Sequence, residues 1–296
     1  MTTQLGPTTT SPADDVAVPA STVADRHRRP VAVRLLGRPG AARLLSVLTV
    51  ILVWQLAQPV LETELIPSPA RVAEFMWAEI RADTVAPDTL YASFAITLGR
   101  LAAGLGLALV IGVPIGLAMG FSWRIDTALS HFVVVGLSVP SLVYAIVTAM
   151  VFGFGSTGPI LTAMLASIAF IILSTAEGVR NVPKDLLKMA AAYRVPTLRR
   201  IRQVVLPGVL PFLFAAIRFG LASGWRGLVV AEIFAASSGA GWMVKFWFDA
   251  HRTYGVLGYA IFFLLFALLI ERLVFGSLGA RLFRWRPQIQ QSGRSR

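Results

Sequence analysis

Long apolar runs separated by short polar segments dominate the chain. Six of the runs are about 20 residues long or longer, the length an α-helix needs to cross the roughly 30 Å hydrocarbon core of a bilayer at about 1.5 Å per residue. The pattern therefore predicts an all-α integral membrane protein with six transmembrane helices. The predicted spans cover residues 42–60, 91–120, 127–152, 160–179, 209–235 and 255–275.

Composition agrees with this pattern and excludes several kinds of chemistry. Of the 296 residues, 56% are hydrophobic and 14% are charged, which is more apolar than a soluble domain needs. The chain has no cysteine and three scattered histidines, His27, His131 and His251, so it offers neither a thiolate nor a clustered metal site. It also lacks a GxxxxGK[ST] phosphate-binding loop. We expect no enzyme activity, metal or cofactor in this chain, and any energy source must come from a partner.

The net charge of +12 could indicate nucleic-acid binding, but membrane proteins concentrate Lys and Arg in cytoplasmic loops. With six spans, the basic segments before residue 42, at 123–124, at 180–202 and at 281–296 all fall on one side. The connection 61–88, which is acidic, falls on the other side. The sequence therefore predicts a multi-pass protein of the inner (plasma) membrane with both termini in the cytoplasm and no nucleic-acid partner.

Three regions follow from these boundaries. Residues 1–41 are rich in Thr, Ser, Pro and Ala without periodicity, which is typical of a disordered tail; no signal peptide is expected there because no cleavage site follows the first apolar run. Residues 42–283 form the predicted transmembrane domain. Residues 284–296 form a basic cytoplasmic tail.

Charged side chains inside predicted spans are costly in lipid, so each should face protein or a water-filled path. Arg226 and Glu232 lie six residues apart on the fifth span and do not share a helical face, so a pair within that helix is not expected. Two interpretations stay open for them and for Arg218: ion pairs with other spans, or the lining of a passage for a polar or anionic solute. Arg100, His131, Glu177 and Glu271 are the other charged or titratable side chains in the spans.

Glycine and proline interrupt the second span as GVPIGLAMG, residues 112–120. Small residues of this kind allow close helix packing, and Pro114 can kink the helix. A second interpretation makes the kink part of a gate.

A polar stretch, residues 183–211, lies between the fourth and fifth spans. Apolar residues repeat at helical spacing on both sides of Pro196, which breaks the run and can open a second helix. The stretch therefore predicts a helix, a turn and a helix on the cytoplasmic side. The apolar positions are Leu186, Leu187 and Ala190 before the turn and Leu198, Ile201 and Val205 after it, and the second half is basic at Arg194, Arg199, Arg200 and Arg202.

The segment KMAAAYRVPTLRRIRQVVLPGVLP, residues 188–211, resembles the coupling (EAA) motif of permease subunits of binding-protein-dependent ABC importers. The family pattern is Glu-Ala-Ala, then a Gly a few residues on, then an apolar residue followed by Leu-Pro. Other segments resemble the sulfonate, taurine and nitrate branch, and the resemblance extends over residues 42–283. These segments are LIPSPARV at 65–72, GVPIGLAMG at 112–120, FGFG at 152–155 and GWRGLVVAEIFAASSGAGWMV at 224–244.

The resemblance implies the MetI-like fold of type I importer permeases and a pathway for a small, anionic solute such as a sulfonate, taurine or nitrate. A vitamin precursor of the pyrimidine or flavin type is the alternative solute, and a secondary transporter is a more distant alternative function. The implied partners are ATP-binding subunits that bind ATP and Mg, an external substrate-binding protein, and a second permease copy or paralogue, so homodimer and heterodimer both stay open. The implied coupling residues are Lys188, Met189, Ala190, Ala191, Tyr193, Arg194, Leu206 and Pro207, and the possible pathway-lining residues are Arg218, Arg226 and Glu232.

Two residues depart from the family pattern. Lys188 stands where the pattern has an acidic residue, and Arg194 stands where it has Gly. A Gly at a helix end takes the left-handed conformation at little cost, whereas Arg would lose about 1 kcal/mol there or force another turn geometry. Pro196 could supply that other geometry by ending the first helix directly.

Overall fold

The computed structural model describes residues 39–61 and 66–276 and divides the chain into two compact units, residues 1–54 and 55–296. The helix α2 (Pro39–Leu61) begins in the first unit, covers the first predicted span and contains the apolar segment Leu44–Ala57. The predicted basic tail 284–296 lies outside the described residues, as does the predicted tail 1–41 apart from the start of α2.

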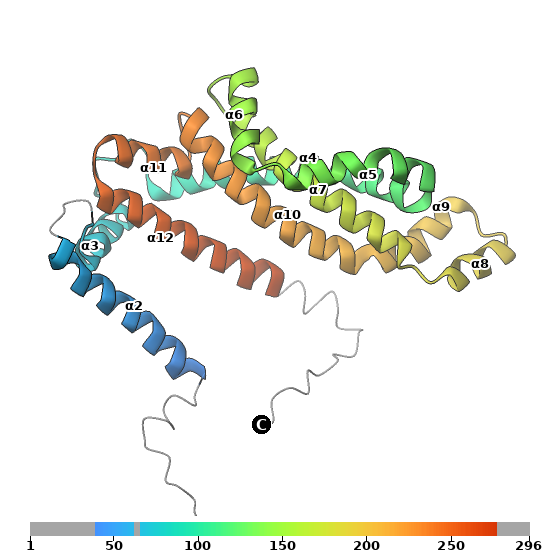
Figure 1. The fold of residues 1–296 in the computed structure, drawn as a ribbon, viewed down its shortest axis with the longest axis horizontal. Helices are drawn as coiled ribbons and strands as arrows, with labels where there is room; N and C mark the ends of the chain where they lie inside the picture. The colour runs from blue at the N-terminus through green and yellow to red at the C-terminus, as the bar shows by residue number, and fades with distance from the viewer. Residues whose placement is uncertain (1–38, 62–65, 277–296) are drawn as a thin grey trace, which may run out of the picture. The chain divides into compact units, whose positions relative to one another are not determined.

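The described residues of the second unit form helices joined by turns, with no strand among them, which confirms the predicted all-α fold (Figure 1). Short turns connect the helices. In chain order the elements are α3 (Pro69–Ile80), α4 (Leu90–Phe121), α5 (Trp123–Ser138), α6 (Ser141–Phe152), α7 (Thr157–Arg180), α8 (Lys184–Ala192), α9 (Thr197–Arg200), the π-helical turn η1 (Ile201–Val205), α10 (Leu206–Ala235), α11 (Ala240–Asp249), α12 (Thr253–Ile270) and the π-helical turn η2 (Glu271–Gly276).

Among the described residues, four helices are long and apolar enough to cross a membrane. They correspond to the second, fourth, fifth and sixth predicted spans. The fifth predicted span is extended at its start, because α9, η1 and α10 form one continuous helix. These four helices cover Leu90–Phe121, Thr157–Arg180, Thr197–Ala235 and Thr253–Leu273.

The third predicted span, expected as one run over residues 127–152, is two helices. α5 and α6 meet at an angle of 97°. Val139, which precedes Pro140, has the extended conformation (φ −70°, ψ 124°), because the proline ring disfavours helical geometry in the residue before it. The expectation of a single straight span is therefore corrected to a bent helix pair.

α7 packs along both α4 and α10 (Figure 1). α4 runs through Pro114 as one helix. At Gly116 a Cβ atom would lie 2.6 Å from the carbonyl oxygen of Ile172 on α7, so only glycine permits this approach. Ser167 on α7 donates a 2.7 Å hydrogen bond to the carbonyl of Gly220 on α10. The structure thus confirms close helix packing at the Gly-rich stretch.

A separate aromatic cluster joins α3 to α11 and α12. Phe75 on α3 and Trp247 on α11 have ring centroids 5.0 Å apart, and Tyr259 on α12 is fully buried beside them. The Tyr259 hydroxyl bonds to Glu79 at 2.5 Å, and that carboxylate is also buried. The acidic connection 61–88 therefore contains a helix that packs against the transmembrane domain.

Candidate coupling segment and transport pathway

The polar stretch folds as the predicted helix, turn and helix. α8 ends at a Schellman motif, in which Arg194 donates to the carbonyl of Ala191 and Val195 donates to the carbonyl of Ala190, both at 2.9 Å. This pair of bonds satisfies carbonyls left open at the helix end, and it requires a left-handed residue after the cap. Pro196 then forms the N-cap of α9, as predicted.

Arg194 itself adopts the left-handed conformation, with φ +50°. Of the two outcomes expected for this position, a strained Arg or another turn geometry, the structure shows the strained Arg. The family pattern has Gly here because Gly has no Cβ to clash in this region. Arg194 therefore adopts the left-handed backbone conformation that Gly would adopt at this position, at a cost of about 1 kcal/mol.

The second helix of the segment is continuous with α10. In η1 the N–H of Leu206 bonds to the carbonyl of Ile201, five residues earlier. Pro207 follows directly; it has no N–H, and in a regular helix its ring would clash with the carbonyl four residues before it. The wide π-helical turn relieves this conflict without breaking the helix. A displacement of the coupling segment would therefore reach α10 directly.

The apolar positions of the segment divide between two faces. Leu187 packs against the cluster that contains Val179, Val182 and Val205, and Ala190 is buried, as the shared face predicted. Leu186 and Leu198, expected on the same inward faces, are instead exposed, Leu198 to 78%. Leu186 is 44% exposed and lines one groove with Pro207 and Gly208 of α10.

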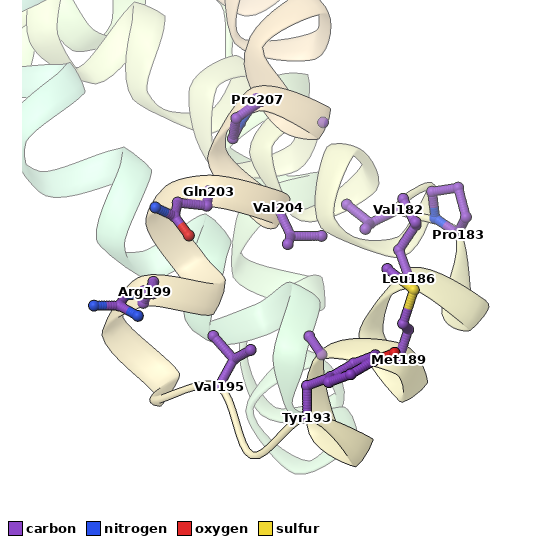
Figure 2. Close-up of a pocket in the computed structure, with 12 residues that line it drawn as sticks. Val182, Pro183, Leu186, Met189, Tyr193, Val195, Arg199, Gln203, Val204 and Pro207 are labelled. Carbon is purple, nitrogen blue, oxygen red and sulfur yellow. The ribbon is translucent and has the colours of Figure 1, made fainter.

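A groove of about 520 Å³ lies between the two helices of the segment. Figure 2 shows Met189 of α8 and Tyr193, the C-cap of that helix, on one wall and residues from η1 and the start of α10 on the other. Tyr193 is 79% exposed. The groove is lined by Val182, Pro183, Leu186, Met189, Ala190, Tyr193, Val195, Arg199, Gln203, Val204, Pro207 and Gly208.

Four of the predicted coupling residues line this groove: Met189, Ala190, Tyr193 and Pro207. Ala190 is buried beneath the groove, with a small part of its surface on the lining. Lys188 is 78% exposed and lies 3.6 Å from the carboxylate of Asp185, an exposed pair that contributes little stability. The exposed residues of the predicted coupling set are Lys188, Met189, Ala191, Tyr193, Arg194, Leu206 and Pro207.

The three possible pathway residues lie in two different environments. Arg218 and Arg226 are exposed on α10; Arg218 pairs with Glu271, and the Nε of Arg226 donates to the carbonyl of Ala222 at 3.2 Å. Glu232 is fully buried and pairs with Arg100 on α4 at 2.7 Å. The interspan ion pairs left open by the sequence are therefore formed by Arg218 and Glu232, and Glu232 is enclosed by protein.

Sequence reasoning missed the partners of two buried carboxylates. Glu232 and Arg100 are 132 positions apart, and no local pattern relates them. Glu79 was counted with the external acidic residues, although it shares a helical face with Val72 and Phe75, both buried. That spacing of three and four residues was the signal that could have placed Glu79 inside.

The model of a protein family, the binding-protein-dependent transport system inner membrane component, matches residues 109–276. The chain belongs to this family. The family comprises permease subunits of ABC importers, and the matched residues include the coupling segment and α10. The secondary-transporter alternative is thereby set aside.

Curated relatives agree with this assignment. The taurine transport system permease protein TauC of Escherichia coli (strain K12) is 31% identical over 84% of this chain and 89% of its own length. A Bacillus subtilis (strain 168) permease named for aliphatic sulfonates is 28% identical over 84% of this chain and 91% of its own. The nitrate import permease NrtB of Synechococcus elongatus is 26% identical over 69% of this chain and 74% of its own. The chain thus falls within the sulfonate, taurine and nitrate branch.

A solved structure supports the fold. A chain of the MetNI methionine ABC transporter, in an inward facing conformation, matches with a TM-score of 0.57 and 18% identity. The match covers 72% of this chain and 97% of that chain. At this identity the likeness concerns the fold alone, which is the predicted MetI-like fold.

Proposed function

We propose that this permease subunit forms the membrane pathway for a small anionic solute, such as a sulfonate, taurine or nitrate, delivered by an external binding protein. The names of the relatives support this solute class, since they refer to taurine, aliphatic sulfonates and nitrate. Arg218 and Arg226 are exposed on α10; Arg218 is paired with Glu271, whereas Arg226 would favour an anion in a water-filled path. Glu232 is enclosed, so we assign the two arginines to the pathway lining.

The exposed surface of the coupling segment is the observation that carries the proposed mechanism. Met189 and Tyr193 expose apolar area beside a groove that is also lined by Arg199. Exposed apolar area next to charge is typical of a surface that docks a protein. We assign this surface to separate ATP-binding subunits, which would bind ATP and Mg and hydrolyse the ATP.

The segment is placed to act on two pathway helices at once. It follows α7 through a three-residue turn and continues directly into α10. Closure of the ATP-binding subunits would therefore move α7 and α10 together as a rigid body, opening the pathway alternately to each side. The distribution of basic residues along the sequence supports an orientation with the coupling segment and both termini in the cytoplasm.

The docking proposal is tested in the complex of this chain with its ATP-binding subunit. Met189→Asp places a charge on the exposed apolar face, and we expect at least a tenfold loss of ATP-binding subunit retained on the purified permease. Val85→Asp is the matched control, because Val85 is 86% exposed in the connection before α4, at the other end of the transmembrane helices. Equal retention in wild type and Met189→Asp would contradict the proposal.

The solute is tested by uptake into proteoliposomes that contain the complete complex and its binding protein. Labelled taurine, an alkanesulfonate and nitrate are offered separately. Uptake of one of them that falls in Arg226→Gln supports an anion pathway lined by that residue. Uptake only of a pyrimidine or flavin precursor would replace the solute class. Tagged and untagged copies of the chain, purified together, distinguish a homodimer from a heterodimer.

A further inference from the structure

The ion pair between Arg100 and Glu232 is the centre of a larger buried network. Arg100 is 5% exposed and Glu232 is 0% exposed. The guanidinium also donates to the carbonyl of Ser238 at 2.7 Å, to the Ser238 hydroxyl at 2.9 Å and to the Ser156 hydroxyl at 3.0 Å. One side chain of α4 therefore holds the turn before α7 and the turn between α10 and α11.

The carboxylate of Glu232 holds the start of α11. Its Oε2 accepts the N–H of Gly241 at 2.9 Å and the hydroxyl of Thr97 at 2.8 Å. The Thr97 hydroxyl in turn accepts the N–H of Ala240 at 2.8 Å. Backbone donors at a helix start have no partner within the helix, so residues from α4 and α10 satisfy them here.

The turn between α10 and α11 packs in direct contact with this network. Gly239 has φ +102°, a conformation that is rare for residues with a Cβ. A Cβ atom at Gly239 would lie 2.4 Å from the Glu232 Oε1 and 2.8 Å from the Arg100 Nη1. The turn 236–239 is therefore set by direct contact with the ion pair.

α11 and the coupling segment lie at opposite ends of one helix. The helix Thr197–Ala235 has 39 residues, which at about 1.5 Å per residue gives a length of about 58 Å. Figure 1 shows α8 and α9 at one end of α10, with α11 at the other. α11 also carries Trp247, which packs on Phe75 of α3. The face formed by α3, α11 and the start of α12 is thus joined to α4 and α10 through the network.

We propose that Arg100 and Glu232 are positioning residues that tie α11 to α4 and α10, so that a protein docking on the α3–α11–α12 face moves the pathway helices. This inference rests on the proposed function, because the docking protein is the external binding protein. On the outer side the network transmits movement to α4 and α10, and on the cytoplasmic side the coupling segment transmits movement to α10.

If the ion pair only stabilised the fold, a substitution that keeps the fold intact would leave the response to the binding protein unchanged. Replacing both partners of a buried pair by apolar residues of similar size is often neutral for stability, whereas removing one partner leaves an unpaired buried charge. The double substitution Arg100→Met with Glu232→Leu therefore leaves no unpaired buried charge, while it removes the bonds to Ser238 and Gly241. Thr97→Val is a milder change of the same kind, because it removes one hydroxyl and keeps the shape.

The test measures ATP hydrolysis by the complete complex in nanodiscs, with and without solute-loaded binding protein. We expect Thr97→Val and the double variant to lose at least fivefold in stimulation by the binding protein, with basal hydrolysis and subunit composition retained. The matched control is Thr148→Val, which removes a buried hydroxyl bonded to Thr162 at 2.7 Å between α6 and α7. We expect wild-type stimulation in this control.

A second measurement keeps the test decisive if the double variant does not assemble. The chain has no cysteine, so Ser237→Cys, an exposed position in the turn, carries a single spin label. Thr97→Val should raise the mobility of that label. Stimulation that stays at the wild-type level in Thr97→Val overturns the inference, whatever the label shows. If the wild-type complex itself shows no stimulation, the proposed function fails instead.

Discussion

The two ends of the helix Thr197–Ala235 differ in how their polar groups are satisfied. At the coupling end, Lys188 and Arg194 are exposed, and Arg194 takes a left-handed backbone conformation. At the other end, Arg100 and Glu232 are buried and bonded to several elements of the same chain. Exposed charges stay hydrated, whereas a buried network must satisfy its own polar atoms. Substitutions should therefore cost more at the buried end.

The largest effect on stability is expected for Gly239→Ala. The backbone conformation alone costs about 1–3 kcal/mol for a residue with a Cβ, and the contact with the Glu232 carboxylate adds to this cost. Unfolding in mixed micelles with increasing SDS measures the change. Gly106→Ala is the control, because a Cβ atom there meets no atom within 4 Å. A similar change in both variants would contradict the tight fit of the turn.

A smaller effect of opposite sign is expected for Arg194→Gly. Glycine relieves the left-handed strain, so the free energy of unfolding should rise by about 1 kcal/mol. Arg194→Ala removes the same charge but keeps a Cβ, so it should give no such gain. The same micelle unfolding assay compares the two variants. An equal gain in both would mean that the Arg charge, and not the backbone conformation, is the cause.

The smallest effect on stability is expected for Lys188→Glu. The side chain is 78% exposed and its pair with Asp185 is solvated, so the free energy of unfolding should change by no more than about 0.5 kcal/mol. Docking of the ATP-binding subunit is tested separately from stability, because Lys188→Glu reverses the charge at this position of the coupling surface. Solute-stimulated ATP hydrolysis by the complete complex measures it. Identical stimulation in both forms would remove any special role of Lys188.

Much of the fold was predictable because hydropathy is a local property. The apolar lengths predicted spans that correspond to α4, α7, α10 and α12, whereas α2 contains only the shorter apolar segment Leu44–Ala57. The apolar spacing around Pro196 predicted the helix, turn and helix. The break at Pro140 also had a local signal, the proline itself, but the continuous apolar run outweighed it. The burial of Ala190 and Val205 followed from the same local pattern, although the outward position of Leu186 and Leu198 did not.

The buried network was not predictable in the same way. Spacing along the helix excluded a pair between Arg226 and Glu232, but it could not select Arg100 on another helix as the partner of Glu232. That choice depends on the side-by-side packing of α4 and α10 and on the turn at Gly239.

Local patterns in the sequence thus determined that the chain is a helical membrane protein with a basic helix-turn-helix between two of its spans, and the resemblance of its segments to a known family indicated a permease. Tertiary structure alone decided which charges are enclosed and which are exposed. The physical reason is that hydropathy and helical spacing act within one segment, whereas the burial of a charge depends on atoms that distant segments bring to it.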